Sequence, residues 1–580
     1  MVILGITPLL SYNQSACLLI DGNLVAWSEE ERHNRFKFSK SGDDILPPKN
    51  AATNCLNTAK LKPRDIDIVS VGFSRLEEIS RRHSPYYAKK SGYIDTDWCG
   101  EYPKDILDSE YGTINWVMNE WSFETNPLTL DVGDNPLKMP AEKIEWYDHH
   151  RSHVASSVIP SGFPDCNYMS YDGDGGGIAS LLGYWDGHQM NNVTFSNALT
   201  SFGLFYEQIT NALAFDTHGC EGKTMGLACY GKADYNLLPM KYREDDLGFR
   251  TPFTNEYQLL LNKIIAEDDY QKELRKFHEA GEGKLPPQTI LNLAATGQDI
   301  FEKLIIHNYK NLLKYNDSKN LCLSGGSMLN CTTNGKLEKI VEGDIFIQPA
   351  AHDSGVALGS AILAHKKHTN DWPPMSMNNA YHGSFFSNTE IVDSLKKHGM
   401  IYEEVDPAEA IAHLLYEWNC VLGYFNGKAE VGPRALCHRS LLADPTKKEN
   451  LQRVNRIKKR EWWRPLAPVM PEEYLFEITN AKHKSPFMLM ASEVKEEWRE
   501  KIPAVVHVDN SCRPQTVNRS QNKVIYDALQ HFRRKTEIPV FMNTSFNVNE
   551  PLVNSPDDAI KTFLENDIDG LLISKYLIMK

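Results

Sequence analysis

The stretch Tyr-Asp-Gly-Asp-Gly-Gly-Gly at residues 171–177 decides the predicted fold, because apolar segments precede and follow it. The flanking segments 167–171 and 178–185 predict the two strands of a hairpin, with polar and glycine residues between them. A similar layout opens the chain, where an Asp-Gly turn at 21–22 lies within another hairpin. Strands are predicted there at 2–6, 15–20 and 24–28. Two such units in one chain indicate an internal duplication.

A third glycine element extends this pattern. Residues 321–323 predict a buried strand that runs into Ser-Gly-Gly-Ser-Met-Leu-Asn at 324–330, and a helix is predicted from there to about residue 341. This arrangement lets a nucleotide lie against the backbone, although most Gly-Gly pairs are simple turns. Duplicated halves around a nucleotide describe an α/β fold of the actin and hexokinase ATPase type, whose hairpins hold phosphates through backbone N–H groups. The candidate nucleotide contacts are Gly325, Gly326 and Asn330.

His149 and His153 are the strongest indication of a metal site. They lie in Asp-His-His-Arg-Ser-His at 148–153, and small residues continue to Pro160. Asp148 is a suitable N-cap, so a helix is predicted, and residues four apart then share one helical face. Histidine is the commonest metal ligand. Two surface histidines without a shared role are the plain alternative for such a pair considered alone.

Asp353 is the predicted third ligand. Residues 345–347 predict a strand, and a helix of small residues is predicted after Asp353, which places this carboxylate at a loop or helix start. Two histidines and one aspartate leave coordination positions open and suit Fe(II), Mn or Zn, with Fe(II) favoured by the resemblance given below. The alternative for Asp353 is a simple helix N-cap.

Composition limits the class of protein. The chain has 580 residues and a net charge of −14, so it repels polyanions on average, and a nucleic-acid acceptor is possible but not favoured. No apolar run approaches the roughly 20 residues that span a bilayer, and the first residues predict a strand rather than a signal peptide. Eleven cysteines are scattered without a Cys-x-x-Cys pair, which is typical of reduced thiols in a cytoplasmic protein.

The chain divides into two predicted domains. Residues 1–365 contain the duplicated unit, with an insertion at about 80–140 whose role the sequence leaves open. The polar segment 366–380 contains Pro-Pro and has no periodicity, so we interpret it as a linker. Residues 381–580 predict a second α/β domain rich in arginine and lysine, with a strand at 571–574. The sequence does not distinguish a monomer from a homodimer.

Several long motifs occur in a consistent order along the chain. The N-terminal set is His-x-x-x-His (149–153), Tyr-Asp-Gly-Asp-Gly (171–175), Glu-Gly-Lys-Thr-Met-Gly-Leu-Ala (221–228), Ser-Gly-Gly-Ser-Met-Leu-Asn (324–330) and Pro-Ala-Ala-His-Asp-Ser-Gly-Val-Ala-Leu-Gly (349–359). The C-terminal set is Val-Gly-Pro-Arg-Ala-Leu-Cys-His-Arg-Ser (431–440), Lys-Lys-Arg-Glu-Trp-Trp-Arg-Pro-Leu-Ala-Pro (458–468) and Met-Asn-Thr-Ser-Phe-Asn (542–547). The ordered set resembles the O-carbamoyltransferase family, typified by the cephamycin, nodulation-factor and tobramycin carbamoyltransferases. The resemblance spans nearly the whole chain apart from about 80–140.

The resemblance implies a two-domain enzyme. Its N-terminal domain is similar to the actin-like proteins of tRNA threonylcarbamoylation, in which two histidines and one aspartate hold iron or a similar ion. Its C-terminal domain is similar to YrdC. In such enzymes carbamoyl phosphate reacts with ATP, supplied with Mg, to give carbamoyl-adenylate and pyrophosphate, and the carbamoyl group then passes to an acceptor hydroxyl. Lys37 and Asp172 match nucleotide-contacting family positions; a surface lysine and a turn aspartate are their alternatives.

The basic residues of the second domain suit a small dianion. Arg434 follows Gly-Pro and Arg464 precedes Pro, so both lie on restrained backbone, and arginine binds phosphate in a bidentate manner. Lys458 adds a point charge. A solvated surface is the usual role of such a basic run, but Trp462 and Trp463 within it favour a shaped pocket. The resemblance adds Arg513 as a further phosphate contact, and the Asn543 amide is suited to bind the carbamoyl group.

One position departs from the family pattern. The first loop reads Ser-Tyr-Asn-Gln at 11–14, so Tyr12 occupies the place of a histidine that lies near the acceptor hydroxyl in relatives. If that histidine is a general base, the role passes to another group in this chain. An activated donor needs only weak base assistance. The candidates are Tyr12 itself, His150, Asp174 and His352.

Two other functions compete with carbamoyl transfer. The actin-like fold also predicts a metal-dependent kinase, but a kinase needs no separate arginine-rich domain. A non-enzymatic nucleotide-binding partner of a tRNA-modification complex is the other alternative, and two complete domains in one chain argue against it. The sequence does not identify the acceptor, which could be a small molecule, a sugar or a hydroxymethylated nucleobase.

Overall fold

The computed structural model describes residues 1–7, 12–41, 44–45, 48–73, 129–132, 135–138, 143–215, 219–279 and 283–580. Most of the predicted insertion at 80–140 lies outside the described residues. The hairpin of β7 (Thr129–Val132) and β8 (Asn135–Lys138) is the part of it that the structure describes. Among all these residues, no helix has both the length and the apolar character needed to cross a membrane.

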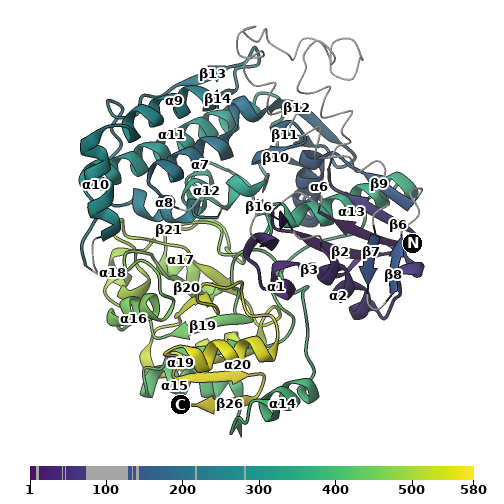
Figure 1. Cartoon of the computed structure of the whole chain (residues 1–580), viewed down its shortest axis with the longest axis vertical. Helices are drawn as coiled ribbons and strands as arrows, with labels where there is room; N and C mark the ends of the chain where they lie inside the picture. Colours follow the sequence, from purple (N-terminus) through teal and green to yellow (C-terminus); the bar gives the residue numbers. More distant parts are fainter. Residues whose placement is uncertain are drawn as a thin grey trace.

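The N-terminal domain contains two five-stranded sheets of the same topology (Figure 1). In each sheet three consecutive strands pair antiparallel, and two later strands then add in parallel beside the first. The order of the first sheet is β3 (Asn23–Glu29), β2 (Ser15–Ile20), β1 (Val2–Ile6), β6 (Ile68–Val71) and β9 (Ile144–Trp146). The order of the second is β12 (Met190–Ser196), β11 (Ile178–Trp185), β10 (Cys166–Gly175), β15 (Leu321–Ser324) and β16 (Ile345–Ile347). The predicted duplication and its actin-like arrangement are thereby confirmed.

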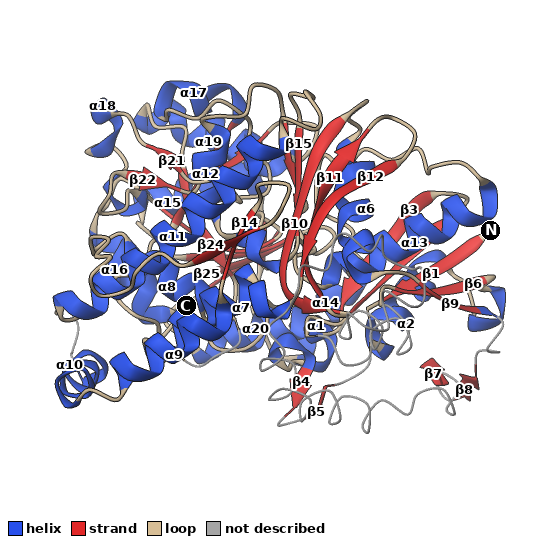
Figure 2. Ribbon diagram, turned by 90° about the horizontal axis from the view of Figure 1, so that it is seen from above, coloured by secondary structure: helices blue, strands red, loops and turns tan. Residues whose placement is uncertain are grey.

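Two long helices pack together between these sheets (Figure 2). Helix α6 (His149–Ser161) contacts β10 and β15, whereas α13 (Ser354–Thr369) contacts β1, β2 and β6. The two helices approach so closely that a Cβ on Gly359 would lie 1.7 Å from the Ser152 carbonyl oxygen. Side chains of β1 alternate between this layer and α2 (Lys49–Ala59) on the outer face, so both faces of the sheet are buried. The tight packing fixes where the first residues of α6 and α13 lie.

Helices between β12 and β16 form a cap at one side of the N-terminal domain (Figure 1). The helix predicted after Asn330 is present as α12 (Cys331–Glu338), which ends slightly before the predicted residue 341, and a 3₁₀-helix, η7 (Gly326–Leu329), precedes it. The helices are α7 (Phe202–Ala212), α8 (Glu221–Ala228), α9 (Thr254–Ile265), α10 (Asp268–Glu279), α11 (Gln288–Leu312) and α12 (Cys331–Glu338).

The C-terminal domain is built on one eight-stranded mixed sheet, which confirms its predicted α/β class. Its likeness to YrdC stays a prediction. The strand order is β17 (Glu403–Glu404), β26 (Tyr576–Met579), β25 (Gly570–Ile573), β18 (Leu422–Phe425), β19 (Arg439–Ala443), β24 (Phe541–Ser545), β20 (Ala467–Pro471) and β23 (Gln515–Val517). The longer helices of this domain are α14 (Asn388–Lys397), α15 (Pro407–Glu417), α16 (Glu449–Ile457), α19 (Lys523–Thr536) and α20 (Pro556–Glu565).

The predicted linker at 366–380 begins too early, because α13 continues to Thr369 and Asn370 ends it with a φ of 62°. The helix extends this far because its last turns carry Lys366 and Lys367, which suit the negative C-terminal end of a helix. Residues 371–380 then lead without a long helix or strand into the second domain.

Candidate functional sites

Helix α6 holds the two predicted histidine ligands on one face. The Asp148 Oδ1 atom accepts a hydrogen bond from the Arg151 N–H at 2.7 Å, which caps the helix as predicted. His149 and His153 are both buried, and their Nε2 atoms lie 3.1 Å apart. Two imidazole nitrogens that converge in this way form one half of a metal site.

Asp353 lies at the start of α13 and faces these histidines. It occupies the N-cap position, yet its side chain makes no capping hydrogen bond, so capping does not account for this carboxylate. Its Oδ1 atom lies 3.6 Å from the Nε2 atoms of both His149 and His153. The structure therefore brings together the three residues predicted to bind one metal.

Asp172, predicted as a nucleotide contact, joins the same cluster. Its Oδ2 atom lies 3.0 Å from His153 Nε2 and 3.4 Å from His149 Nε2, and one ligand atom from each of the four residues lies within 4.8 Å of the others. Its Oδ1 atom accepts a hydrogen bond from the Gly326 N–H at 3.2 Å, so it also contacts the predicted nucleotide loop. We name His149, His153, Asp172 and Asp353 the histidine–aspartate cluster.

The histidine–aspartate cluster fits a divalent cation. His149 Nδ1 lies 3.2 Å from the Gly72 carbonyl oxygen, and donating there leaves Nε2 as the ligand atom. Burial would lower the pKa of His153, but hydrogen bonds with Asp172 and Asp353 raise it to about 9. Burial would likewise raise the pKa of Asp172, but both histidines hold it well below its usual value. The two carboxylates thus stabilise positive charge at the point where a metal would bind.

The predicted nucleotide residues separate into two groups. Gly325 has a φ of 84°, and a Cβ there would lie 2.1 Å from the Tyr171 carbonyl oxygen, so the loop after β15 lies directly against β10. Asn330 caps α12 through the Thr333 N–H and exchanges hydrogen bonds with Gln298, contacts that also explain its presence structurally. Lys37 is exposed in the 3₁₀-helix η1 (Lys37–Ser39) and is far from these glycines in the sequence. The segment just before it meets the second domain, where Arg35 donates a hydrogen bond to the Leu552 carbonyl oxygen.

The candidate bases differ in their surroundings. His150 is fully buried, with Nε2 placed 2.8 Å from the Ile178 carbonyl oxygen and Nδ1 placed 3.2 Å from Ser170 Oγ. Burial lowers the pKa of His150 to about 3. These contacts describe a structural histidine more readily than a base that meets an acceptor.

The loop that contains Tyr12 borders the histidine–aspartate cluster. Ser354, the neighbour of Asp353, donates a hydrogen bond from Oγ to the Asn13 carbonyl oxygen at 2.8 Å. Tyr12 is partly exposed, and Asp174 is exposed near the end of β10. His352 is buried, and its Nδ1 accepts a hydrogen bond from the Ser354 N–H at 3.1 Å. Tyr12 and Asp174 are thus the predicted bases that solvent reaches most readily.

A cavity of about 230 Å³ lies between the two domains, and it is lined by arginines. Helices α8 and α12 of the N-terminal domain form one wall, and strands β20 and β24 with adjacent loops form the other. Three of the predicted phosphate ligands line this cavity, together with Arg460, which was not singled out from the sequence. We name it the arginine cavity; its cationic residues are Arg434, Arg460, Arg464 and Arg513.

The arginine cavity concentrates positive charge with little compensation. Neither Arg434 nor Arg513 forms an ion pair with any described residue, and the Nε atoms of both are buried without a hydrogen-bond partner. Burial and the charges of Arg513 and Arg464 lower the pKa of Arg434 to about 9. Such a group of like charges is stabilised when an anion binds among them.

Asn543 lines the same cavity from β24. Its Nδ2 group donates to the Gln515 Oε1 at 2.7 Å and to the Ala435 carbonyl oxygen at 3.1 Å, which fixes the orientation of the amide. Its Oδ1 atom is buried without a partner. The site therefore combines unpaired donors for an anion with an unpaired acceptor for an N–H group.

Lys458 does not line the arginine cavity. Its Nζ donates to the Asn547 carbonyl oxygen at 2.8 Å and to the Ser545 carbonyl oxygen at 2.5 Å, with Asn547 Oδ1 also at 2.8 Å. Burial, reinforced by nearby arginines and by Lys37, lowers the pKa of Lys458 well below its usual value. Its observed contacts hold the loop after β24, and so the wall of the cavity.

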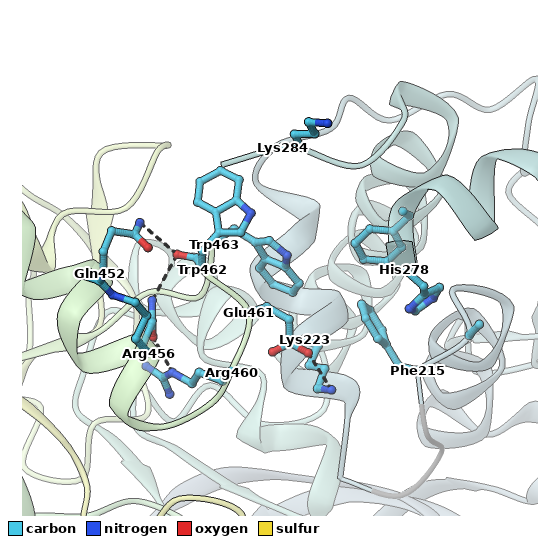
Figure 3. Close-up of a pocket in the computed structure, with 13 residues that line it drawn as sticks. Phe215, Lys223, His278, Lys284, Gln452, Arg456, Arg460, Glu461, Trp462 and Trp463 are labelled. Atoms are coloured by element: carbon cyan, nitrogen blue, oxygen red, sulfur yellow. Dashed lines mark hydrogen bonds and ion pairs between the residues drawn. The ribbon is translucent and has the colours of Figure 1, made fainter. Parts of the chain in front are cut away.

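A second, larger cleft of about 530 Å³ adjoins the arginine cavity (Figure 3). Trp462, Trp463 and Phe215 present aromatic surface to it, and Arg460 lines both spaces. Lys223 of α8 pairs with Glu461 of the second domain at 2.8 Å, as the dashed line in Figure 3 marks. Both domains build this cleft, but neither tryptophan lines the arginine cavity, so the shaped anion pocket predicted around them is not the space that they border.

Glu29, at the end of β3, connects the two sites. Its Oε1 accepts a hydrogen bond from Ser354 Oγ at 3.0 Å, beside Asp353. Its Oε2 accepts from the Gly432 N–H at 3.0 Å and from Arg32 at 2.8 Å, close to Arg434. Gly432 has a φ of 92°, and a Cβ there would lie 2.3 Å from the Pro349 carbonyl oxygen. The loop before α13 and the loop that carries Arg434 are therefore packed against each other.

Comparisons with known proteins match this chain over most of its length. A family model described as Carbamoyltransferase N-terminus matches residues 2–362, and one described as Carbamoyltransferase C-terminus matches residues 412–580. Nodulation protein NolNO of Sinorhizobium fredii is 31% identical over 581 residues, which cover 98% of this chain and 79% of the relative. Nodulation protein NolO of Bradyrhizobium diazoefficiens is 34% identical over 451 residues, which cover 75% of this chain and 79% of the relative. Among solved structures, full-length HypF in its phosphate- and nucleotide-bound form is 14% identical, with a TM-score of 0.33 over 65% of this chain and 56% of that chain.

Proposed function

The chain belongs to the carbamoyltransferase family, and from this premise we propose that it is an ATP-dependent O-carbamoyltransferase. In the first half-reaction, water displaces phosphate from carbamoyl phosphate, and an oxygen of the resulting carbamate attacks the α-phosphorus of ATP. Pyrophosphate leaves, and carbamoyl-adenylate remains. In the second, an acceptor hydroxyl oxygen attacks the carbamoyl carbon, AMP leaves, and the hydroxyl proton passes to a base.

The single observation that supports this proposal is the composition of the arginine cavity. Arg434 and Arg513 have unpaired donors for the phosphate of carbamoyl phosphate, and Asn543 Oδ1 is an unpaired acceptor for the carbamoyl NH₂ group. A phosphate monoester without an amide would leave that acceptor unsatisfied, which costs about 1–3 kcal/mol. The combination therefore favours carbamoyl phosphate over simpler anions.

The histidine–aspartate cluster is the proposed place of carbamoyl transfer. His149, His153 and Asp353, with Asp172 beside them, would hold one divalent metal, for which Fe(II) is our first proposal. A metal bound there supplies a Lewis acid that polarises an oxygen. Asp174, which is exposed, and Tyr12, which is partly exposed, are the proposed bases. Backbone N–H groups after β15 would contact the phosphates of ATP, and Mg would accompany them.

The proposal is tested by product analysis. The purified protein is incubated with ATP, Mg and carbamoyl phosphate, with and without panels of aminoglycosides, sugars and hydroxymethylated nucleosides. Carbamoyl-phosphate-dependent release of AMP and pyrophosphate, with a carbamoylated acceptor detected by mass spectrometry, is the expected result. Formation of ADP instead would identify a kinase, and no turnover with any acceptor would favour a non-catalytic partner. A cytoplasmic location, where ATP is plentiful, is part of the proposal.

A further inference from the structure

A second group of metal-binding side chains lies where α8 meets the C-terminal domain. Cys229 directly follows α8, and His507 and Asp509 lie in the turn before β22 (Ser511–Cys512). One ligand atom from each residue lies within 4.8 Å of the others. Within the part of the chain that the structure describes, this group and the histidine–aspartate cluster are the two with such spacing.

His507 has the unsatisfied nitrogen that a ligand would complete. Its side chain is 8% exposed, its Nδ1 lies 3.6 Å from Asp509 Oδ1, and its Nε2 is buried without a hydrogen-bond partner. The Tyr230 ring packs edge-on against the imidazole, with ring centroids 5.5 Å apart. A buried imidazole nitrogen without a partner is unfavourable, and a bound cation would remove that cost.

Hydrogen bonds around the turn hold these ligands in place. Asp509 Oδ1 accepts from the Ser511 N–H at 3.0 Å and from Ser511 Oγ at 2.6 Å, while the His507 N–H donates to the Ser511 carbonyl oxygen at 2.8 Å. Outer contacts of this kind orient the ligands of metal sites. Cys229 caps the C-terminus of α8, where the helix dipole places partial negative charge that favours a cation.

We propose that Cys229, His507 and Asp509 bind a zinc ion at the interface between the two domains. One thiolate, one imidazole and one carboxylate are established zinc ligand types, and three protein ligands leave a fourth position open. The two ligand charges balance that of Zn²⁺, so the bound site is neutral and tolerates the nearby arginines. Cys229 and His507 both line the arginine cavity, so an anion or water there can fill the fourth position. The site does not depend on the proposed carbamoyl transfer.

Cobalt substitution tests the site selectively. The His149→Ala/His153→Ala variant is stripped with a chelator and reloaded with Zn²⁺ or Co²⁺, so that the histidine–aspartate cluster contributes little. We expect one equivalent of zinc per chain and a thiolate-to-cobalt charge-transfer band in the near ultraviolet. The histidine–aspartate cluster contains no thiol, so this band cannot come from that cluster.

Matched variants in the same background decide the assignment. Cys229→Ser and His507→Ala should each weaken zinc binding at least about 100-fold, and Cys229→Ser should abolish the cobalt–thiolate band. Cys331→Ser is the control, because Cys331 lines the same cavity but lies outside the group, and it should retain both signals. Circular dichroism verifies that each variant is folded. The proposal is overturned if the parent variant takes up no zinc, or if folded Cys229→Ser keeps the band.

Discussion

The histidine–aspartate cluster and the arginine cavity are both polar sites, but their charges are arranged in opposite ways. In the cluster, two imidazoles face two carboxylates, and His153 lies 3.0 Å from Asp172. In the arginine cavity, the positive charges of Arg434 and Arg513 repel each other, and neither has a carboxylate partner among the described residues. Nearby acids raise the pKa of His153 to about 9 against the effect of burial, whereas burial and nearby arginines lower the pKa of Arg434 to about 9.

The difference shows how each site is prepared for its ligand. In the histidine–aspartate cluster, the negative charges of Asp172 and Asp353 favour a proton on His153. A metal ion that binds there would displace this proton. The cavity is unfavourable while empty, since its like charges gain a partner only when an anion binds. Removing the metal-binding side chains of the histidine–aspartate cluster should therefore abolish function. Replacing an unpaired arginine of the arginine cavity by an uncharged residue should instead leave the empty protein equally stable or more stable.

The largest effect is expected when the metal ligands are removed. His149→Ala/His153→Ala should lower the metal content by one equivalent and abolish carbamoyl transfer, because two of the four clustered donors are lost. Some consumption of ATP and carbamoyl phosphate should remain, since the arginine cavity is unchanged. Elemental analysis and product assays measure both. His368→Ala, at an exposed pair with Glu145, is the control. Full metal content in the double variant would refute the assignment.

Arg434→Ala should reduce carbamoyl-phosphate-dependent pyrophosphate release roughly 30- to 1,000-fold, because losing a charged contact to the transition state costs about 2–4 kcal/mol. Transfer from supplied carbamoyl-adenylate should survive, since that step is placed at the histidine–aspartate cluster. Arg519→Ala removes an arginine from an exposed pair with Asp527 and should change neither step. If a folded, metal-loaded Arg434→Ala protein cannot use carbamoyl-adenylate, the two sites are one.

The strain of the empty cavity should appear in thermal unfolding. Arg434→Met keeps an unbranched side chain about as long as the aliphatic part of arginine and removes one of the mutually repelling charges, so its melting temperature should equal or exceed that of the wild type. Phosphate at 100 times its dissociation constant should stabilise the wild type by about 2.7 kcal/mol and the variant by much less. Calorimetry with and without phosphate makes the comparison. A variant that melts well below the wild type would show that the charge is structural.

The smallest effect is a pH dependence of anion binding. Arg434 has a lowered pKa of about 9, so its charge is present below that pH and is lost as pH rises through it. Affinity for carbamoyl phosphate should therefore fall by up to about tenfold per unit above pH 9. The unfolded arginine stays charged to higher pH, so the destabilisation of the empty fold is fully present below pH 9 and decreases above it. Arg434→Met should lack this step; an unchanged wild-type profile would contradict the assignment.

Local patterns were sufficient to predict the duplicated sheets and the histidine pair. Hairpins depend on neighbouring residues, so β1 to β3 and β11 lie close to their predicted bounds, whereas β10 continues to Gly175 through most of the predicted loop. The cap on α6 and the position of Asp353 at the start of α13 follow from the same kind of short-range signal. Arg434 and Arg464 were predicted from their restrained backbone and Asn543 from its amide, whereas the resemblance added Arg513. The structure places all four around one cavity.

Long-range pairing was beyond the sequence. Asp172 meets the histidines because α6 packs against β10, which carries it, and a carboxylate within a strand does not reveal which helix covers that strand. Lys458 was predicted to face the anion, but its contacts with Ser545 and Asn547 depend on the path of a distant loop. Cys229 and His507 belong to different domains, so no spacing within one motif connects them.

The contacts of Glu29 make the two sites subject to thermodynamic reciprocity. One carboxylate accepts hydrogen bonds from Ser354, beside Asp353, and from Gly432, beside Arg434. A ligand that favours one position of either loop therefore acts on the other through this shared partner. Binding free energies are functions of state, so whatever factor an anion at Arg434 applies to the affinity for the metal, the metal applies to the affinity for the anion.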